Sequence, residues 1–291
     1  MNRSSFLKHL ALLSAGTALL PRLKVVQNSR FIELRNGIGT FSMRGGTIGW
    51  MAKPGFTIVV DSQYSDTASD FLDGIQRFDG GPETVLINSH HHGDHVSGNG
   101  VFRDAGYRIL AHEQVPKLQR RGADEIVAAE ETFSDTMELD AGDETVILKY
   151  YGNAHTGGDT VTWFQNANIA HMGDLVFNRL YPFIDRDGGA SISGWINLLE
   201  TVADEGDSDT LYIFGHGDPE FGITGGRADL LHMRDFLTKV LEHTAQGLDA
   251  GRSREEITQV SSFDEFPDFI SPSDFLSLPR NLNVAYRELT E

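Results

Sequence analysis

Residues 87–99 read INSHHHGDHVSGN and hold four of the eleven histidines of the chain within six positions. The apolar residues 84–88 that lead into the cluster are typical of a short buried strand. On an extended segment alternate side chains point to the same side, so His90 and His92 face one way and His91 the other. One metal ion could therefore bind His90 and His92 together.

Gly93 has no Cβ and permits a tight turn, which would bring Asp94 and His95 round to a second ion. Neutral imidazole and carboxylate bind zinc, and such a set of nitrogen and oxygen ligands also accepts iron or manganese. A flexible or pH-sensitive loop rich in histidine is the alternative interpretation of so short a motif. The metal-site interpretation needs further ligands from elsewhere in the chain.

Three later loops supply such residues, each just after a predicted strand. His155 lies in YGNAHTGGDT, Asp174 in IAHMGDLVF and His216 in YIFGHGDPE. A single histidine after a strand is usually structural, but three such loops added to the first cluster favour a metal site assembled from separate segments.

Charge and composition exclude several classes of function. The chain has 291 residues and a formal net charge of -18. An acidic surface argues against nucleic acid as a partner and leaves a small-molecule substrate. No cysteine is present, which excludes disulfides, thiolate nucleophiles and thiolate metal ligands. Any metal must be held by nitrogen and oxygen.

Residues 1–27 are predicted to be an export signal. Basic Arg3 and Lys8 precede an apolar run at residues 10–20 that is too short to span a bilayer comfortably. The segment resembles a bacterial twin-arginine signal, although only Arg3 stands where a pair is expected. We expect a periplasmic or secreted protein without stable membrane insertion after processing. The pattern does not decide whether the segment is cleaved, and the alternative is an amphipathic helix packed on the domain.

Hydrophobic patterning divides the rest of the chain into two halves, each of strands followed by helices. Strands are expected within residues 31–60, 84–88, 108–111, 144–151, 160–164, 169–172 and 211–214, and helices at 65–78, 96–104, 113–131, 193–203 and 227–242. This order predicts two sheets packed face to face with helices outside, in one catalytic domain at residues 28–248. Residues 249–291 are expected to be a tail packed on the domain, with a lid or a dimer contact as the alternatives.

The motif His-x-His-x-Asp-His, which residues 90–95 meet, resembles the signature of the metallo-β-lactamase-fold hydrolases. His155, Asp174 and His216 follow in the order typical of that superfamily, and the resemblance covers roughly residues 30–245. It extends to the stretches GDLVFN (173–178), SGWI (193–196) and GHG (215–217). The resemblance implies an α/β fold, namely a four-layer αββα sandwich with the metal ions at one edge of the two sheets.

The same resemblance implies ligands for two divalent ions, expected to be zinc with iron or manganese as alternatives. The first ion takes His90, His92 and His155, the second takes Asp94, His95 and His216, and Asp174 bridges the two. Two ions about 3.5–4 Å apart can share one water and lower its pKa, so that a bridging hydroxide becomes the nucleophile. Asp94 is the predicted catalytic residue, because it would also orient that hydroxide.

Several other residues have two interpretations. Asp61 is expected either to fix a ligand imidazole or to serve as a turn former at a strand end. Tyr181 could donate to a substrate oxygen or pack in the core, and Trp50 could contact substrate or be core. His91 is expected to point away from the metals. The other histidines outside the motifs are interpreted as structural or surface residues: His112, His171, His232 and His243.

The substrate is less constrained than the metal site, since this scaffold serves many reactions. The bridging Asp174 points to the glyoxalase II-like and lactonase-like side of the superfamily, and hence to a carbonyl ester, lactone, thioester or amide. β-Lactamases with a cysteine ligand are excluded by composition, while those with equivalents of Asp94, His95 and His216 remain an alternative. The sequence leaves the substrate and the oligomeric state open.

Two other classes of protein compete with a hydrolase. Iron-dependent persulfide dioxygenase-like oxidoreductases use this fold, but they hold one iron with fewer ligands. Oxygen-reducing di-iron relatives place a glutamate where His92 stands. A binding protein that kept the fold and lost the chemistry would not be expected to retain every ligand.

Overall fold

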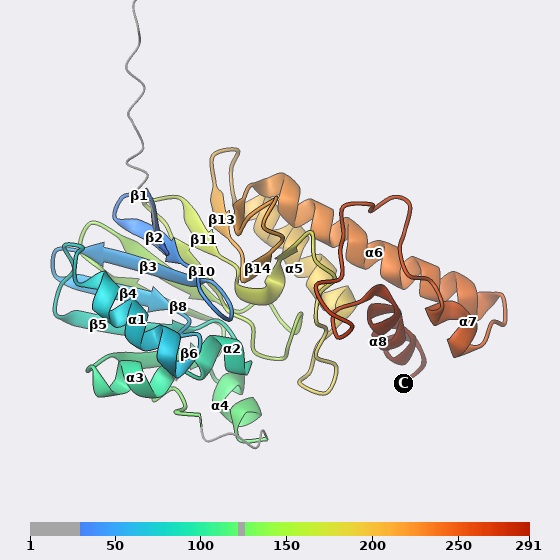
Figure 1. Cartoon of the computed structure of the whole chain (residues 1–291), viewed down its shortest axis with the longest axis horizontal. Coiled ribbons are helices and arrows are strands. Elements are labelled where there is room, and N and C mark those ends of the chain that lie inside the picture. Colours follow the sequence, from blue (N-terminus) through green and yellow to red (C-terminus); the bar gives the residue numbers. More distant parts are fainter. Residues whose placement is uncertain (1–29, 122–125) are drawn as a thin grey trace, which may run out of the picture.

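The computed structural model describes residues 30–121 and 126–291 as two β-sheets with helices on their outer faces (Figure 1). The predicted export segment, residues 1–27, lies outside the described residues. Within them, no helix combines the length and the apolar character needed to cross a membrane.

The first sheet has seven strands in sequence order. They are β1 (Phe31–Arg35), β2 (Ile38–Phe41), β3 (Ile48–Lys53), β4 (Phe56–Val60), β5 (Glu83–Asn88), β6 (Arg108–His112) and β7 (Glu131–Phe133). Strands β1 to β4 pair antiparallel, whereas β4 to β7 pair parallel. Because β4 and β5 are parallel, the residues that follow them, including Asp61 and His90, leave the sheet at the same edge.

The second sheet has six strands in the order β15-β13-β11-β10-β9-β8. These are β15 (Thr224–Gly225), β13 (Leu211–Ile213), β11 (Ile169–His171), β10 (Val161–Phe164), β9 (Thr145–Lys149) and β8 (Thr136–Asp140). Strands β11 and β13 are parallel, so Asp174 and His216 also follow strand ends at one edge. A short parallel pair, β12 (Phe177–Asn178) and β14 (His216–Gly217), continues from there.

The helices lie outside the sheets. They are α1 (Ser65–Ile75), α2 (Gly93–Val96), α3 (Asn99–Asp104), α4 (Gln114–Gln119), α5 (Ile192–Glu205), α6 (Arg227–Asp249), α7 (Arg254–Thr258) and α8 (Leu278–Thr290), with a 3-10 turn, η1, at Gly173–Leu175. Figure 1 shows α1 and α3 beside the first sheet and the long helices α5 and α6 on the opposite side of the molecule.

Three separate clusters of buried apolar side chains fill the spaces between the layers. One joins α1 and α3 to the first sheet and includes Trp50 and Phe71. The second lies between the sheets and includes Ile58 and Leu148. The third joins the second sheet to α5, α6 and the C-terminal region, and includes Trp195. Three such interfaces require four layers, so the predicted αββα sandwich is confirmed.

One sequence-based expectation is wrong in this part of the chain. Among the described residues of the helix predicted over residues 113–131, only α4 is α-helical, and Glu131 begins strand β7. Phe133 of β7 is buried between the sheets, and parallel pairing with β6 overrides the local helical pattern. Of the two interpretations of Trp50, the core one matches the structure, because Trp50 is fully buried with its ring centroid 4.2 Å from that of Phe78.

The C-terminal tail (residues 249–291) continues directly from α6 and packs against it. Leu278 and Leu282 of α8 are fully buried in the cluster that also covers α5 and α6. Glu288 of α8 accepts hydrogen bonds from the backbone N–H groups of Ile192 and Ser193, at 2.7 and 3.0 Å. These N–H groups begin α5 and have no partner within the helix, so the tail satisfies them.

Candidate metal centre

The predicted ligands converge at the edge where strands of both sheets end. His90 and His92 lie between β5 and α2, Asp94 and His95 lie in α2, His155 lies between β9 and β10, Asp174 lies in η1, and His216 begins β14. Segments far apart in the sequence therefore meet at one place, and the chain brings all the predicted ligands together.

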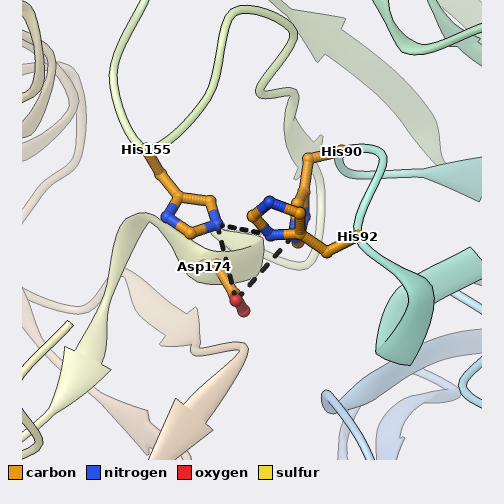
Figure 2. Close-up of side chains that lie close together, drawn as sticks. All are labelled: His90, His92, His155 and Asp174. Carbon is orange, nitrogen blue, oxygen red and sulfur yellow. Dashed lines mark hydrogen bonds and ion pairs between the residues drawn. The ribbon is translucent and has the colours of Figure 1, made fainter. Parts of the chain in front are cut away.

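One group contains three imidazoles and a carboxylate. His92 Nδ1 lies 3.0 Å from His90 Nε2 and 3.1 Å from His155 Nε2. Asp174 Oδ2 is 3.8 Å from His90 Nε2 and 3.6 Å from His155 Nε2. Figure 2 shows the four side chains pointing toward a common centre from three separate segments. These residues could hold one metal ion.

The second group lies on the other side of Asp174. His216 Nε2 is 3.1 Å from Asp94 Oδ2 and 3.4 Å from His95 Nε2. Asp174 Oδ1 is 3.0 Å from His95 Nε2 and 3.4 Å from His216 Nε2. The two oxygens of Asp174 thus face different groups of ligands, which is the arrangement expected of a bridging carboxylate.

In the first group, each imidazole makes a hydrogen bond with the ring nitrogen that faces away from the other ligands. This bond determines which nitrogen of the ring carries the proton. His90 Nδ1–H donates to Ser89 Oγ at 3.0 Å, and His155 Nδ1–H donates to the carbonyl oxygen of Phe183 at 2.8 Å. His92 Nε2–H donates to Asp185 Oδ2 at 3.1 Å. Each neutral ring then presents a bare nitrogen to the other two.

The unprotonated nitrogens of the three rings show whether a metal ion suits this group of residues. The lone pair of His92 Nδ1 lies about 3 Å from the nitrogens His90 Nε2 and His155 Nε2, and these lone pairs repel one another unless a cation lies between them. Asp174 Oδ1 is likewise buried and accepts no well-formed hydrogen bond. Both features are explained by metal ions, whose ligands are neutral imidazoles and ionised carboxylates.

Asp61 serves both groups of ligands. Its Oδ1 accepts a hydrogen bond from the Ser89 N–H, and its Oδ2 accepts from Ser89 Oγ and from His95 Nδ1, each at 2.7 Å. Since Ser89 Oγ in turn accepts from His90, one buried carboxylate orients an imidazole of each group. Asp61 also has a left-handed backbone, with φ of 68°, a conformation that is uncommon outside glycine. The imidazole-fixing interpretation of Asp61 therefore matches its contacts.

Burial keeps the first group uncharged. Burial and the neighbouring His95 hold the pKa of His90 well below its ordinary range. Burial and His92 lower the pKa of His155 to about 3. Neutral imidazole is the form that binds a metal, so these residues need no deprotonation before they bind one at neutral pH.

In the second group, nearby carboxylates determine the pKa values of the histidines. Burial alone would lower the pKa of His95, but the nearby Asp174 and Asp94 hold it well above its ordinary range. The pKa of His216 is raised to about 9 by Asp174 and Asp94, against the effect of burial. Burial would raise the pKa of Asp174, yet His216 and His95 hold it well below its usual range. A cation would take over the role of these protons.

Two residues near Asp174 support the backbone around it. His171 donates from Nε2 to the carbonyl oxygen of Thr47 at 3.1 Å and accepts at Nδ1 from the Gly173 N–H at 3.2 Å. It is therefore structural, as the sequence interpretation supposed. A Cβ at Gly215 would clash with Asp174 Oδ1, so this close approach requires glycine.

Tyr181 and His91 belong to neither of the two groups of ligands around Asp174, although His91 could hold a metal ion together with His92 and Asp185. Tyr181 is buried, and its ring packs against Phe236 and Phe269, so its proposed hydrogen bond to a substrate oxygen is not supported. His91 points to Asp185, with Nε2 3.3 Å from Oδ2. The packed interpretations of both residues match the structure.

Asp185 is a residue that the sequence reasoning missed. It accepts hydrogen bonds from His92 and His91, and these hold the pKa of Asp185 well below its usual range although burial would raise it. No motif marks Asp185, because it lies 93 positions from His92 and only the folded chain brings them together.

Replacing Asp185 with asparagine is expected to weaken metal binding in the first group about 10–100-fold. The amide can donate to His92 Nε2, which would move the proton of the ring to Nδ1 and block that ligand atom. Calorimetric titration of Zn²⁺ into chelator-treated protein measures the affinity. Asp187→Asn is the matched control, because its side chain is 86% exposed and pairs with Arg287. Equal affinities for Asp185→Asn and wild type would refute the prediction.

Asp159 stabilises the loop that contains His155 by accepting hydrogen bonds within it. Its carboxylate accepts hydrogen bonds from the backbone N–H and the hydroxyl of Thr156, both at 2.7 Å. Burial nevertheless raises the pKa of Asp159 from 3.8 to about 6. Folding at neutral pH therefore buries a carboxylate that would bind a proton more readily than an exposed one.

Asp159→Asn is expected to remove part of the pH dependence of stability. Because the folded-state pKa of Asp159 is raised, its proton stabilises the fold fully below pH 3.8, and this stabilisation is lost as the pH rises through about 6. The unfolding free energy of wild type minus that of the variant should fall by about 2–3 kcal/mol between about pH 4 and pH 7. Urea unfolding of both metal-free proteins measures this, and a constant difference would count against it.

A comparison with known protein families agrees with the fold and the ligand geometry. The family model of the metallo-beta-lactamase superfamily matches residues 44–216, which is more than half of the chain. The chain therefore belongs to the metallo-β-lactamase superfamily.

Individual relatives are distant. A metallo-beta-lactamase type 2 from Bacteroides fragilis is 23% identical over 163 residues, which cover 56% of this chain and 63% of the relative. The structure of the stereoselective inverting sec-alkylsulfatase Pisa1 from Pseudomonas sp. has a TM-score of 0.70 at 13% identity, over 89% of this chain and 50% of that one. A metallo-beta-lactamase from Hirschia baltica has a TM-score of 0.60 at 16% identity, over 71% and 96%. The chain thus spans under two thirds of the curated relative, and the two structures support the fold alone.

Proposed function

We propose that the protein is a hydrolase with a dinuclear metal centre, expected to be zinc, which acts on a carbonyl ester, lactone, thioester or amide. His90, His92 and His155 would hold one ion, Asp94, His95 and His216 the other, and Asp174 both. The observation that carries this proposal is the position of Asp174, whose oxygens lie 3.0–3.8 Å from ligand nitrogens of both groups.

The ions would supply an activated water as nucleophile and a Lewis acid for the carbonyl oxygen. The protein supplies the positioning. Asp94 is the proposed catalytic residue: its side chain is 28% exposed and lines a cavity together with His216 and Asp174, of which Asp174 is buried. A carboxylate at this place can accept a hydrogen bond from the attacking water and hold it toward a substrate in the cavity.

Purified protein tests the proposal directly. We expect about two zinc ions per chain by elemental analysis, and hydrolysis of at least one member of a panel comprising a lactone, an aryl ester, a thioester and nitrocefin. A chelator should abolish the activity and Zn²⁺ should restore it. One iron per chain would instead favour an oxidoreductase, and activity that survives complete metal removal would refute the proposal.

A β-lactam amide is the second candidate substrate, because the curated relative is named a metallo-beta-lactamase. Nitrocefin in the panel decides between the two, since it is hydrolysed only if the site accepts that ring. We also propose that residues 1–27 direct the protein to the periplasm or the medium, which N-terminal sequencing of the exported protein would test.

A further inference from the structure

A cavity of about 440 Å³ opens directly onto the proposed metal ligands. Its polar side is formed by His92, Asp94, Asp174 and His216. The rest of the lining is apolar: Phe177, Leu180, Phe183, Pro272, Phe275 and Leu276. The volume lies within the range of small-molecule sites, and the combination of an apolar wall with a few polar groups is typical of them.

Half of that apolar wall comes from the C-terminal tail, beyond the residues matched by the family model. The ring of Phe275 stacks on that of Phe183, with centroids 5.0 Å apart and 27° between the planes. Phe275 is nevertheless 51% exposed. An apolar group in the cavity could cover part of this exposed ring.

The tail is fastened to the segment that carries the other half of the wall. The Ile270 N–H donates to the carbonyl oxygen of Arg179 at 3.0 Å, and the carbonyl of Ile270 accepts from the Tyr181 N–H at 3.1 Å. Arg179 Nε also lies 2.7 Å from Asp268 Oδ2. The buried Asn281 side chain donates to the carbonyl oxygen of Pro182 at 2.7 Å. The two halves of the wall are thus held in fixed relation.

The charge of the lining limits what it can bind. Among the described residues, the lining of this cavity includes no Lys or Arg that could pair with a carboxylate or a phosphate of a substrate. Arg280 lies over the ring of Phe275, 4.8 Å from its centroid, but is not part of the lining. An uncharged alkyl or aryl group can enter such a wall without the cost of burying an unpaired charge.

We infer that the C-terminal tail forms the wall of a subsite for an uncharged alkyl or aryl group of the substrate, with Phe275 as the specificity-determining residue. The inference rests on the proposed function, because it places the reacting bond of the substrate over the metal ligands. It assigns the substrate class as esters and related acyl compounds whose group against the tail wall is uncharged and hydrophobic, and it disfavours substrates that would place an anionic group there.

A series of p-nitrophenyl esters tests the subsite on the zinc-loaded protein. We expect kcat/KM to rise from acetate through butyrate to octanoate, by up to about fourfold for each methylene that becomes buried. Phe275→Ser should lower kcat/KM for octanoate about tenfold and change that for acetate less than twofold. Leu289→Ser, which also removes a half-exposed apolar side chain of the tail but lies outside the cavity lining, should change neither.

Binding of decan-2-one to the metal-free protein separates this inference from the proposed function, because it requires no hydrolysis. We expect Phe275→Ser to weaken that binding about tenfold and Leu289→Ser to leave it unchanged. Weakened binding in a protein that hydrolyses no member of the panel would overturn the proposed function and keep the subsite. Three results would overturn the subsite. The first is a ratio of kcat/KM for octanoate to that for acetate that is unchanged in Phe275→Ser. The others are a higher kcat/KM for p-nitrophenyl hemiglutarate than for the butyrate ester, and no binding of decan-2-one.

Discussion

Asp174→Asn is expected to lower the affinity for both metal ions and to reduce kcat/KM at least about a hundredfold. The loss should exceed the 10–100-fold effect of removing an outer hydrogen-bond partner, because Asp174 would be a ligand itself. Its Oδ2 faces His90 and His155, and its Oδ1 faces His95 and His216. An amide has no negative charge and keeps only one oxygen, so one group of ligands would face an N–H instead.

Elemental analysis and kinetics on the most active ester of the panel measure this effect. Asp209→Asn is the matched control, since Asp209 has a side chain that is 83% exposed and pairs with Arg35 far from the ligands. A far-UV circular dichroism spectrum like that of wild type checks that the variant is folded. If Asp174→Asn binds two zinc ions as tightly as wild type, the bridging role is wrong.

Asp61→Asn is expected to weaken both metal sites about 10–100-fold, although Asp61 would touch neither ion. All three hydrogen bonds to Asp61 come from donors, and an amide nitrogen would have to face one of them. If it donates to His95 Nδ1, the proton of that ring moves to Nε2, the atom that faces Asp174. Because Asp61 is fully buried, the mismatch should also cost about 1–3 kcal/mol of stability.

A second variant separates metal positioning from general destabilisation. Ser89→Ala removes the hydroxyl between His90 and Asp61 but leaves the bond from His95 to Asp61 in place. We expect it to weaken binding in the first group and to spare the second, whereas Asp61→Asn should weaken both. If Zn²⁺ titrations show that the two variants weaken both sites to the same extent, Asp61 affects metal binding only by stabilising the fold.

The sequence predicted the four-layer fold because its evidence is local. Apolar runs of strand length, interrupted by turns and followed by helical patterns, can be recognised one segment at a time. The motif at residues 90–95 is also local, and the later loops with His155, Asp174 and His216 each follow a predicted strand. That these loops meet at one edge of the two sheets was implied by the resemblance to the metallo-β-lactamase-fold hydrolases.

The same local evidence failed where pairing or packing with a distant segment determines the structure that a residue adopts. Glu131 begins a strand because β6 lies beside it, although this partner is not evident from the neighbouring residues. Trp50 had two interpretations, and its burial against Phe78 decides for the core. The helices of the C-terminal tail, α7 and α8, were likewise not expected from its acidic and aromatic composition.

The sequence by itself thus determined the fold class and which side chains could serve as metal ligands, because residue type and spacing along a strand carry that information. Only the tertiary structure decided which nitrogen of each ring is free, which carboxylate orients it, and that Phe275 lies beside the cavity. Asp61, Asp185 and Phe275 act across long sequence separations, and such contacts depend on how the layers and the tail pack against one another.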